Sequence, residues 1–173
     1  FRRVLFRSVS PKAETPAILR AQAFGVNTAV LPYKSEGYGE KLMALLKVNQ
    51  VQIICLAGYM TLLPGEVVSA YRGRILNIHP ALLPKFGGKG MYGHFVHEAV
   101  LAAGETESGC TVHYVTEEYD EGAPIIQKRC PVLPGDTVET LSARVLDLEH
   151  AAYQEALTHV ARKIESGEHG QED

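Results

Sequence analysis

The segment from Ile75 to Met91, ILNIHPALLPKFGGKGM, constrains the fold more than any other stretch of the sequence. It begins as a short apolar strand, in which alternation places Asn77 and His79 on the same face. Pro80 then ends the strand, because proline has no N–H to donate to a neighbouring strand. A glycine-rich loop follows. The pattern presents an amide and an imidazole at the carboxyl end of a strand, where ligands bind in open α/β sheets.

The size and charge of the chain narrow its class. Its 173 residues suffice for one domain with a sizeable core, and we expect a single domain over residues 1–173. The formal net charge of -3 gives no reason to expect nucleic acid or a membrane as partner. The three cysteines, Cys55, Cys110 and Cys130, lie in apolar runs without a CxxC pair. We therefore expect buried free thiols in a reducing cytoplasm, and no metal site.

Strand-like and helix-like segments alternate through most of the chain. Thr15 before Pro16 is typical of a helix start. The run Val51–Ala57 is apolar and rich in β-branched residues, so we expect a central strand covered on both faces. Expected helices cover residues 16–24, 38–47, 64–71, 94–103 and 138–164, and expected strands cover residues 28–31, 51–57, 74–78, 109–116 and 124–132.

The last two expected strands alternate like half-exposed strands and are joined by a short acidic loop. This pattern predicts an α/β fold: a Rossmann-like, doubly wound and mainly parallel sheet, with a C-terminal antiparallel strand pair and a long terminal helix. Residues 166–173 read as a polar tail. Residues 1–7 are atypical, because arginines alternate with apolar residues there, and they read as an amphipathic edge strand or as foreign sequence.

Three polar residues form the candidate catalytic set: Asn77, His79 and Asp120. Asn77 offers a donor to an oxyanion, and His79 offers a titratable proton. Asp120, in the EEYDEG loop, is placed to orient His79 and to raise its pKa. No GxSxG nucleophile motif is present, so we expect direct attack by a substrate group. Each residue taken alone also fits a structural role, such as ending a strand or forming a turn.

The block NIHPALLPKFGGKGMYG and the later GCTVHYVT…YDEGAPIIQ block resemble the phosphoribosylglycinamide formyltransferase family of the folate-dependent formyltransferase superfamily. The resemblance extends from about Ser8 into the terminal helix, and Pro80 after His79 favours this family over its relatives. It implies transfer of the formyl group of 10-formyltetrahydrofolate to the amino group of glycinamide ribonucleotide, in purine biosynthesis. In that family the amine attacks the formyl carbon, the residue matched by Asn77 holds the oxyanion, and the residue matched by His79 protonates the leaving nitrogen.

The resemblance also implies binding residues and partners. The implied folate-binding residues are Met60, Thr61, Leu62, Leu63, Asn77, Thr116, Glu117, Glu118, Tyr119 and Asp120. Glu149, in the LEH of the terminal helix, matches the residue that contacts glycinamide ribonucleotide. The implied partners are two small-molecule substrates, with 10-formyltetrahydrofolate as co-substrate, no permanently bound cofactor and a cytoplasmic location. The sequence leaves the oligomeric state open.

Two departures from the family pattern keep alternatives open. Ala81 stands where the family usually has serine. The family also begins with a strand and an SGxGSN-type loop that holds the ribonucleotide phosphate, and neither is found ahead of Ser8, so we expect an N-terminally truncated domain that lacks its first βα unit. The alternatives are a 10-formyltetrahydrofolate hydrolase, whose motif resembles NIHHSFLP and which carries a preceding regulatory domain, and a non-catalytic folate-binding remnant.

Overall fold

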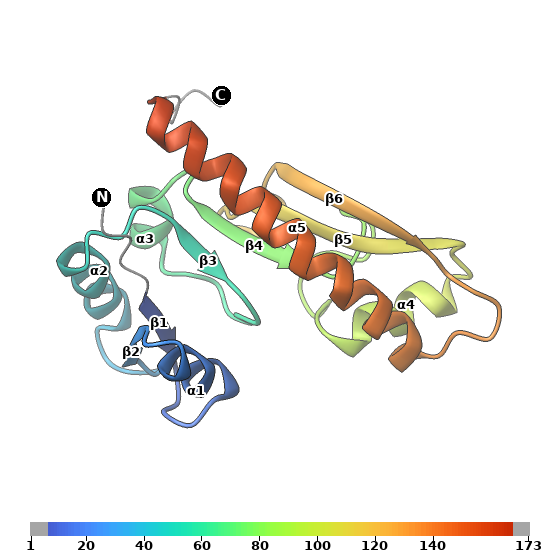
Figure 1. Ribbon diagram of the computed structural model, residues 1–173, viewed down its shortest axis with the longest axis horizontal. Helices are drawn as coiled ribbons and strands as arrows, with labels where there is room; N and C mark the ends of the chain where they lie inside the picture. The colour runs from blue at the N-terminus through green and yellow to red at the C-terminus, as the bar shows by residue number, and fades with distance from the viewer. Residues whose placement is uncertain (1–6, 168–173) are drawn as a thin grey trace. The chain divides into compact units, whose positions relative to one another are not determined.

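The computed structural model describes residues 7–167 and contains two compact units, Phe1–Val51 and Gln52–Asp173. In the first unit, the strands β1 (Arg7–Ser10) and β2 (Asn27–Val30) pair in parallel. Helix α1 (Pro16–Ala23) connects them, and α2 (Tyr38–Val48) follows (Figure 1). Thr15 caps α1 as predicted, because its side chain accepts a hydrogen bond from the Ile18 amide at 3.3 Å.

The second unit contains a four-stranded mixed sheet (Figure 1). Its strands, in spatial order, are β3 (Ile54–Leu56), β4 (Ile75–His79), β5 (Glu107–Tyr114) and β6 (Pro124–Pro131). Strands β3 and β4 are parallel, whereas β5 is antiparallel to both of its neighbours. The helices are α3 (Gly65–Ala70), α4 (His94–Ala102) and α5 (Val138–Ser166). The predicted α/β class, C-terminal antiparallel pair and long terminal helix are confirmed. Residues 1–6 and 168–173, which include most of the atypical start and of the polar tail, lie outside the described residues.

Strand β3 differs from the prediction. We expected a buried central strand over residues 51–57, but β3 has three residues, and β4 is its sole sheet partner within residues 7–167. Cys55 is exposed, so the prediction of a buried thiol is wrong for this residue, whereas Cys110 and Cys130 are buried as predicted. An apolar run indicates a strand, but the burial of that strand depends on how many neighbours it has.

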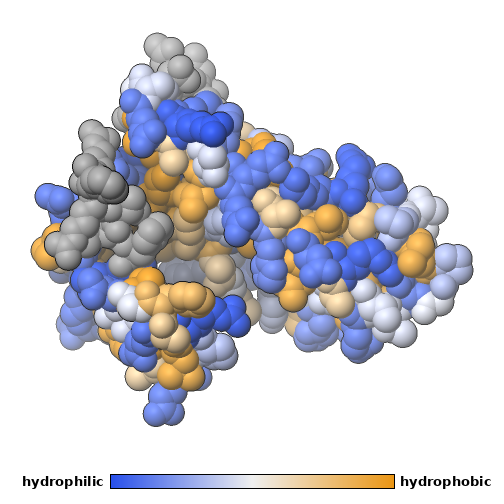
Figure 2. All heavy atoms as spheres, viewed as in Figure 1, coloured by the Kyte–Doolittle hydropathy of each residue, from blue (hydrophilic) through white to orange (hydrophobic). Residues whose placement is uncertain are grey.

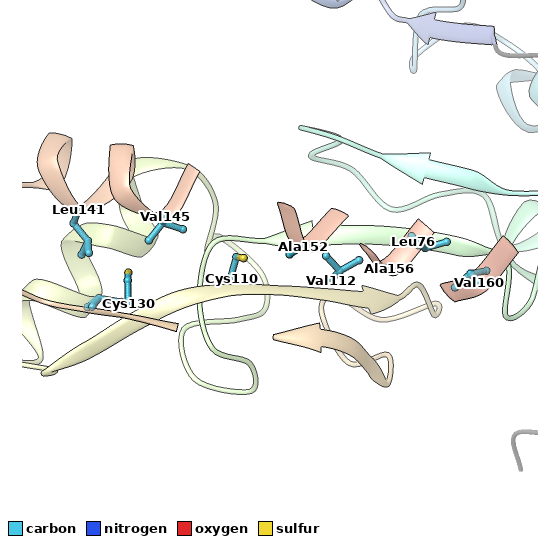
Figure 3. Close-up of a cluster of buried hydrophobic side chains, with 10 residues drawn as sticks. Leu76, Cys110, Val112, Cys130, Leu141, Val145, Ala152, Ala156 and Val160 are labelled. Atoms are coloured by element: carbon cyan, nitrogen blue, oxygen red, sulfur yellow. The ribbon is translucent and has the colours of Figure 1, made fainter. Parts of the chain in front are cut away.

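Helix α5 covers one face of the sheet and provides half of the core. Its buried side chains pack against apolar side chains of β4, β5 and β6 (Figure 3). The cluster consists of Leu76, Val100, Cys110, Val112, Cys130, Leu141, Val145, Ala152, Ala156 and Val160. Helical spacing predicts that Leu141, Val145, Leu148, Ala152 and Leu157 face inward. Leu141, Val145 and Ala152 are fully buried, whereas Leu148 and Leu157 are half-buried and Ala156 is fully buried. Hydrophilic residues cover much of the outer side of α5 on the face seen in Figure 2.

Candidate active site

The register of β4 and β5 brings four polar side chains to the sheet face that lies opposite α5. Asn77 pairs with His113, and His79 pairs with Thr111. Because side chains alternate along a strand, these four point away from the core formed by Leu76 and its neighbours. His79, Thr111 and His113 are all at most 3% exposed. The predicted pairing of Asn77 and His79 on one face is therefore present, and β5 adds an imidazole and a hydroxyl.

Asp120 joins the two imidazoles. Its carboxylate lies 3.5 Å from Nδ1 of His79 and 3.4 Å from Nε2 of His113. The Asp120 backbone is in the left-handed region (φ 56°), which aspartate tolerates better than most residues. Gly122 permits this turn, since a Cβ at that position would overlap the Tyr114 carbonyl. The structure thus brings together the three predicted catalytic residues Asn77, His79 and Asp120 through His113.

The glycine-rich loop after β4 covers these groups. The Phe86 carbonyl accepts a hydrogen bond from Nε2 of His79 at 2.7 Å, and the Gly88 amide donates to Asp120 at 2.9 Å. Phe86 also has a left-handed backbone (φ 57°). Gly87 is required by close packing, because a Cβ there would lie 2.5 Å from Cδ2 of Leu83 and 3.4 Å from Cβ of Asp120. The loop therefore makes hydrogen bonds with both His79 and Asp120.

The hydrogen-bond partners define where the protons of the two imidazoles lie. Nδ1 of His113 faces the Tyr114 carbonyl at 2.7 Å and donates to it. Nε2 of His113 lies 3.2 Å from the Asn77 amide nitrogen and 3.4 Å from Oδ1 of Asp120, so it accepts from Asn77 when it carries no proton and donates to Asp120 when it carries one. Both ring nitrogens of His79 also face oxygen atoms, those of Phe86 and Asp120. An imidazolium at His79 satisfies both contacts, so this position is built to receive a proton.

Burial and charge act in opposite directions on His79. Burial lowers the pKa of the His79 imidazole below its usual value, although the Asp120 charge and the Phe86 carbonyl act to raise it. The expectation that a nearby carboxylate gives His79 a raised pKa is therefore wrong in its net direction. Burial also acts to raise the pKa of the Asp120 carboxyl, but hydrogen bonds from His113 and the Gly88 amide outweigh it, and this pKa lies below its usual value. The site holds an anionic carboxylate beside an imidazole that loses its proton readily.

The two segments predicted to bind folate lie close to one another. The first, Met60–Leu63, is in the loop between β3 and α3, where Met60 is 65% exposed. The second, Thr116–Asp120, follows β5. A Cβ on Gly65, at the start of α3, would lie 4.0 Å from Oε1 of Glu117. The two segments therefore approach one another near Gly65 and Glu117.

Glu149 is half-buried on α5, the helix on the other face of the sheet. Burial raises the pKa of its carboxyl above the usual value, and His150 opposes this. Among the hydrogen bonds and ion pairs of residues 7–167, none joins Glu149 to Asn77, His79 or Asp120. The structure therefore leaves Glu149 apart from the other three predicted residues.

Sequence reasoning assigned no role to several groups at the site. His113 and Thr111 were visible as polar residues in a strand, but their partners depend on the register. His97, on α4, is 3% exposed, and its Nδ1 has no hydrogen-bond partner among the described residues. Burial lowers the pKa of His97, with a smaller contribution from His79. In the sequence, the sign that His97 is buried was its position on the apolar side of a helix.

Within residues 7–167, no group of three or more His, Cys, Asp or Glu side chains is arranged to hold a metal ion. Among the described helices, none combines the length and apolar character needed to cross a membrane.

Comparison with known proteins places this geometry in a family. The model of the formyl transferase family matches residues 7–157, which is most of the chain. The chain belongs to the formyl transferase family. The resemblance identified from the NIHP block is thereby confirmed.

Individual members of the family are similar over most of this chain. The trifunctional purine biosynthetic protein adenosine-3 of Gallus gallus is 44% identical over 94% of the chain, which corresponds to 16% of that protein. The chloroplastic phosphoribosylglycinamide formyltransferase of Arabidopsis thaliana is 46% identical over 79% of the chain and 49% of that protein. The chain thus spans less than half the length of either curated relative.

The fold of the family is shared as well. The crystal structure of phosphoribosylglycinamide formyltransferase from Brucella melitensis superposes with a TM-score of 0.81 at 46% identity. The match covers 90% of this chain and 79% of that one. The two-unit chain described above therefore has the α/β architecture of this formyl transferase.

Proposed function

We propose that the chain transfers the formyl group of 10-formyltetrahydrofolate to the amino group of glycinamide ribonucleotide. Membership of the formyl transferase family supports the reaction type, and the names of similar proteins support the acceptor. The observation that carries the proposal is the cluster of Asn77, His79 and Asp120 around His113, under a glycine-rich loop at the end of β4.

The side chains of the cluster divide the chemistry among them. The amine nitrogen attacks the formyl carbon, and Asn77 donates to the resulting oxyanion. The tetrahedral intermediate collapses when the bond from the formyl carbon to the folate nitrogen breaks, and His79 gives its proton to that nitrogen. The proton released by the amine passes through water to Asp120 and returns to His79. The lowered pKa of His79 suits a donor, since its imidazolium is a stronger acid than usual.

Binding of the two substrates is assigned to three places. We propose that Met60–Leu63 and Thr116–Asp120 contact the folate, because the family resemblance implies both segments and Gly65, two residues after Leu63, lies close to Glu117. We propose that Glu149 contacts the ribonucleotide, on the strength of its LEH motif. A single domain over residues 1–173 stays a prediction.

The partners follow from the reaction. The chain acts on small molecules, with 10-formyltetrahydrofolate as a co-substrate and no permanently bound cofactor. The net charge of -3 supports the absence of nucleic acid and membrane partners. A cytoplasmic location is proposed from the two buried free thiols, Cys110 and Cys130.

One assay tests the proposal against its alternatives. The chain is incubated with 10-formyltetrahydrofolate, with and without glycinamide ribonucleotide, and both formylated ribonucleotide and formate are measured. Formyl transfer supports the proposal. Formate release without acceptor indicates a hydrolase, and folate binding without either product indicates a non-catalytic remnant. The assay is repeated with a strand and an SGxGSN-type loop fused ahead of Ser8.

Substitutions then test the site. In whichever form is active, Asn77→Ala and His79→Ala should each lower kcat by about 100-fold or more, as loss of an oxyanion donor or general acid does. Lys89→Ala, which removes an exposed side chain from the same loop, serves as the control. Retention of most of the activity by either alanine variant would contradict the assignment.

A further inference from the structure

The loop between β4 and α4 depends on two side chains from neighbouring strands. Its first residues, Ala81 to Leu83, lie in neither a helix nor a strand, so their backbone groups need other partners. Thr111 on β5 donates its hydroxyl proton to the Ala81 carbonyl at 2.7 Å and accepts from the Leu83 amide at 3.1 Å. Gln127 on β6 donates to the Leu83 carbonyl at 2.9 Å.

The two side chains act as one unit. Thr111 and Gln127 lie opposite one another in the β5–β6 ladder, and the Gln127 amide donates to the Thr111 hydroxyl at 3.0 Å. With these bonds, the hydroxyl uses its single proton and both of its lone pairs. The amide nitrogen of Gln127 likewise directs its protons to Leu83 and Thr111. Because Thr111 is completely buried, each missing bond would leave a polar group without water to replace it.

The same loop reaches the candidate active site three residues later. Phe86 follows the anchored Leu83, and its carbonyl accepts the hydrogen bond from Nε2 of His79. Thr111 is also the residue that pairs with His79 in the β4–β5 ladder. The start of the loop is thus fastened by Thr111 and Gln127, and its middle contacts the imidazole through the Phe86 carbonyl.

We infer that Thr111 and Gln127 are positioning residues: by fastening Ala81 and Leu83 they place the Phe86 carbonyl against His79 and so set the orientation of its ring. The catalytic meaning of this placement rests on the proposed formyl transfer, but the placement itself does not. A purely structural role would change the stability of the fold. A positioning role changes the state of His79 in protein that remains folded.

The test compares matched variants by NMR titration of the histidine rings. Thr111→Val removes the hydroxyl and keeps a β-branched side chain, whereas Thr111→Ser keeps the hydroxyl. Gln127→Met removes the amide from a partly solvated position, where the loss should disturb folding less. It provides the same test if Thr111→Val does not fold. Thr158→Val is the control, because the Thr158 hydroxyl donates to the Gln154 carbonyl of the preceding turn, on the exposed side of α5.

The expected result is a change at His79 alone. Loss of the Phe86 hydrogen bond, which acts to raise the pKa of His79, should lower that pKa in Thr111→Val and Gln127→Met and shift the Nε2 resonance. Thr111→Ser should return both towards the parent values, and Thr158→Val should leave them unchanged. Folded Thr111→Val or Gln127→Met with parental His79 titration would overturn the inference.

Activity separates this inference from the proposed function. If formyl transfer is observed, Thr111→Val should lower kcat by about 10- to 100-fold with little change in KM, as expected for a misplaced catalytic group. If His79 responds to the variants but no variant transfers a formyl group, the positioning role stands and the proposed function fails.

Discussion

Asp120 is the residue on which the candidate site is organised. One carboxylate contacts two buried imidazoles and a loop amide, and the Asn77 amide reaches it through His113. The pKa of Asp120 and that of His79 are both lowered, but for different reasons: hydrogen bonds stabilise the carboxylate, and burial disfavours the imidazolium. The two groups therefore stay in different charge states at neutral pH.

The lowered pKa of His79 predicts how stability depends on pH. Below its usual pKa of about 6.5, the unfolded chain binds this proton more readily than the folded chain does, so the free energy of unfolding falls as pH falls. We expect His79→Gln to lose less stability than the parent between pH 7 and pH 5, by about 1.4 kcal/mol for each unit of pKa lowering. Urea denaturation at both pH values measures this. Equal losses in the two proteins would contradict it.

A second prediction at the scale of single residues concerns the substitution of Gly87. Alanine at this position would place its Cβ 2.5 Å from Cδ2 of Leu83 and in contact with Cβ of Asp120 at 3.4 Å, so the Leu83 side chain would have to rearrange within the loop. We expect Gly87→Ala to destabilise the fold by about 1–3 kcal/mol and to lower kcat about 100-fold. Thermal unfolding and the formyl-transfer assay measure the two effects, with Lys89→Ala as the control. An unchanged kcat would show that the loop position is irrelevant to the reaction.

At the scale of elements, α5 is the helix that the rest of the second unit depends on. It begins with a capping box, in which Thr137 accepts from the Thr140 amide and Thr140 accepts from the Thr137 amide. Asp136 and Arg144 then form two charge-assisted hydrogen bonds, at 2.7 and 2.9 Å, across the first turns. Five side chains that are fully or nearly fully buried follow along the helix. Fraying of its first turn would therefore disturb the packing of the core.

The cap gives a prediction for this helix. Thr137→Ala should lower the free energy of unfolding by about 0.5–2 kcal/mol, because an amide of the first turn loses its acceptor. The His79 resonances should not change, since the capping box makes no contact with the site. Chemical denaturation provides the measurement, and Thr158→Ala, in the exposed middle of the helix, provides the control. A variant as stable as the parent would show that the cap contributes nothing.

At the scale of the whole molecule, the exposure of the three cysteines differs from strand to strand. Cys55 on the outer strand β3 is exposed, whereas Cys110 and Cys130 lie under α5. Burial raises the pKa of all three thiols, that of Cys110 to about 11, so it is the exposure of Cys55 that separates it from the other two. Thiol chemistry therefore distinguishes the edge of the sheet from its core.

This difference predicts a labelling pattern. A thiol reagent should modify Cys55 in the folded protein, and Cys110 and Cys130 only at the rate of global unfolding. Mass spectrometry of labelled peptides, with and without denaturant, measures the pattern, and Cys55→Ser should abolish the fast phase. Fast labelling of Cys110 in native buffer would contradict the packing of α5 on the sheet.

The sequence by itself determined what depends on near neighbours in the chain. Apolar spacing predicted α5 and most of its buried face, and the Thr15–Pro16 pair predicted the start of α1. The two-residue period of a strand placed Asn77 and His79 together, and the NIHP block led to the family. These features were predictable because helix and strand periods and caps are local properties.

The tertiary structure decided everything that depends on which strands pair and in what register. The β4–β5 register set His113 beside Asn77 and Thr111 beside His79, and no local pattern specifies that pairing. Strand packing also left β3 with one sheet neighbour within residues 7–167 and Cys55 exposed, against expectation. It also buried His79, so that desolvation outweighs the charge of Asp120. Periodicity says which face a side chain occupies, but long-range packing alone determines what lies opposite it and how much water remains.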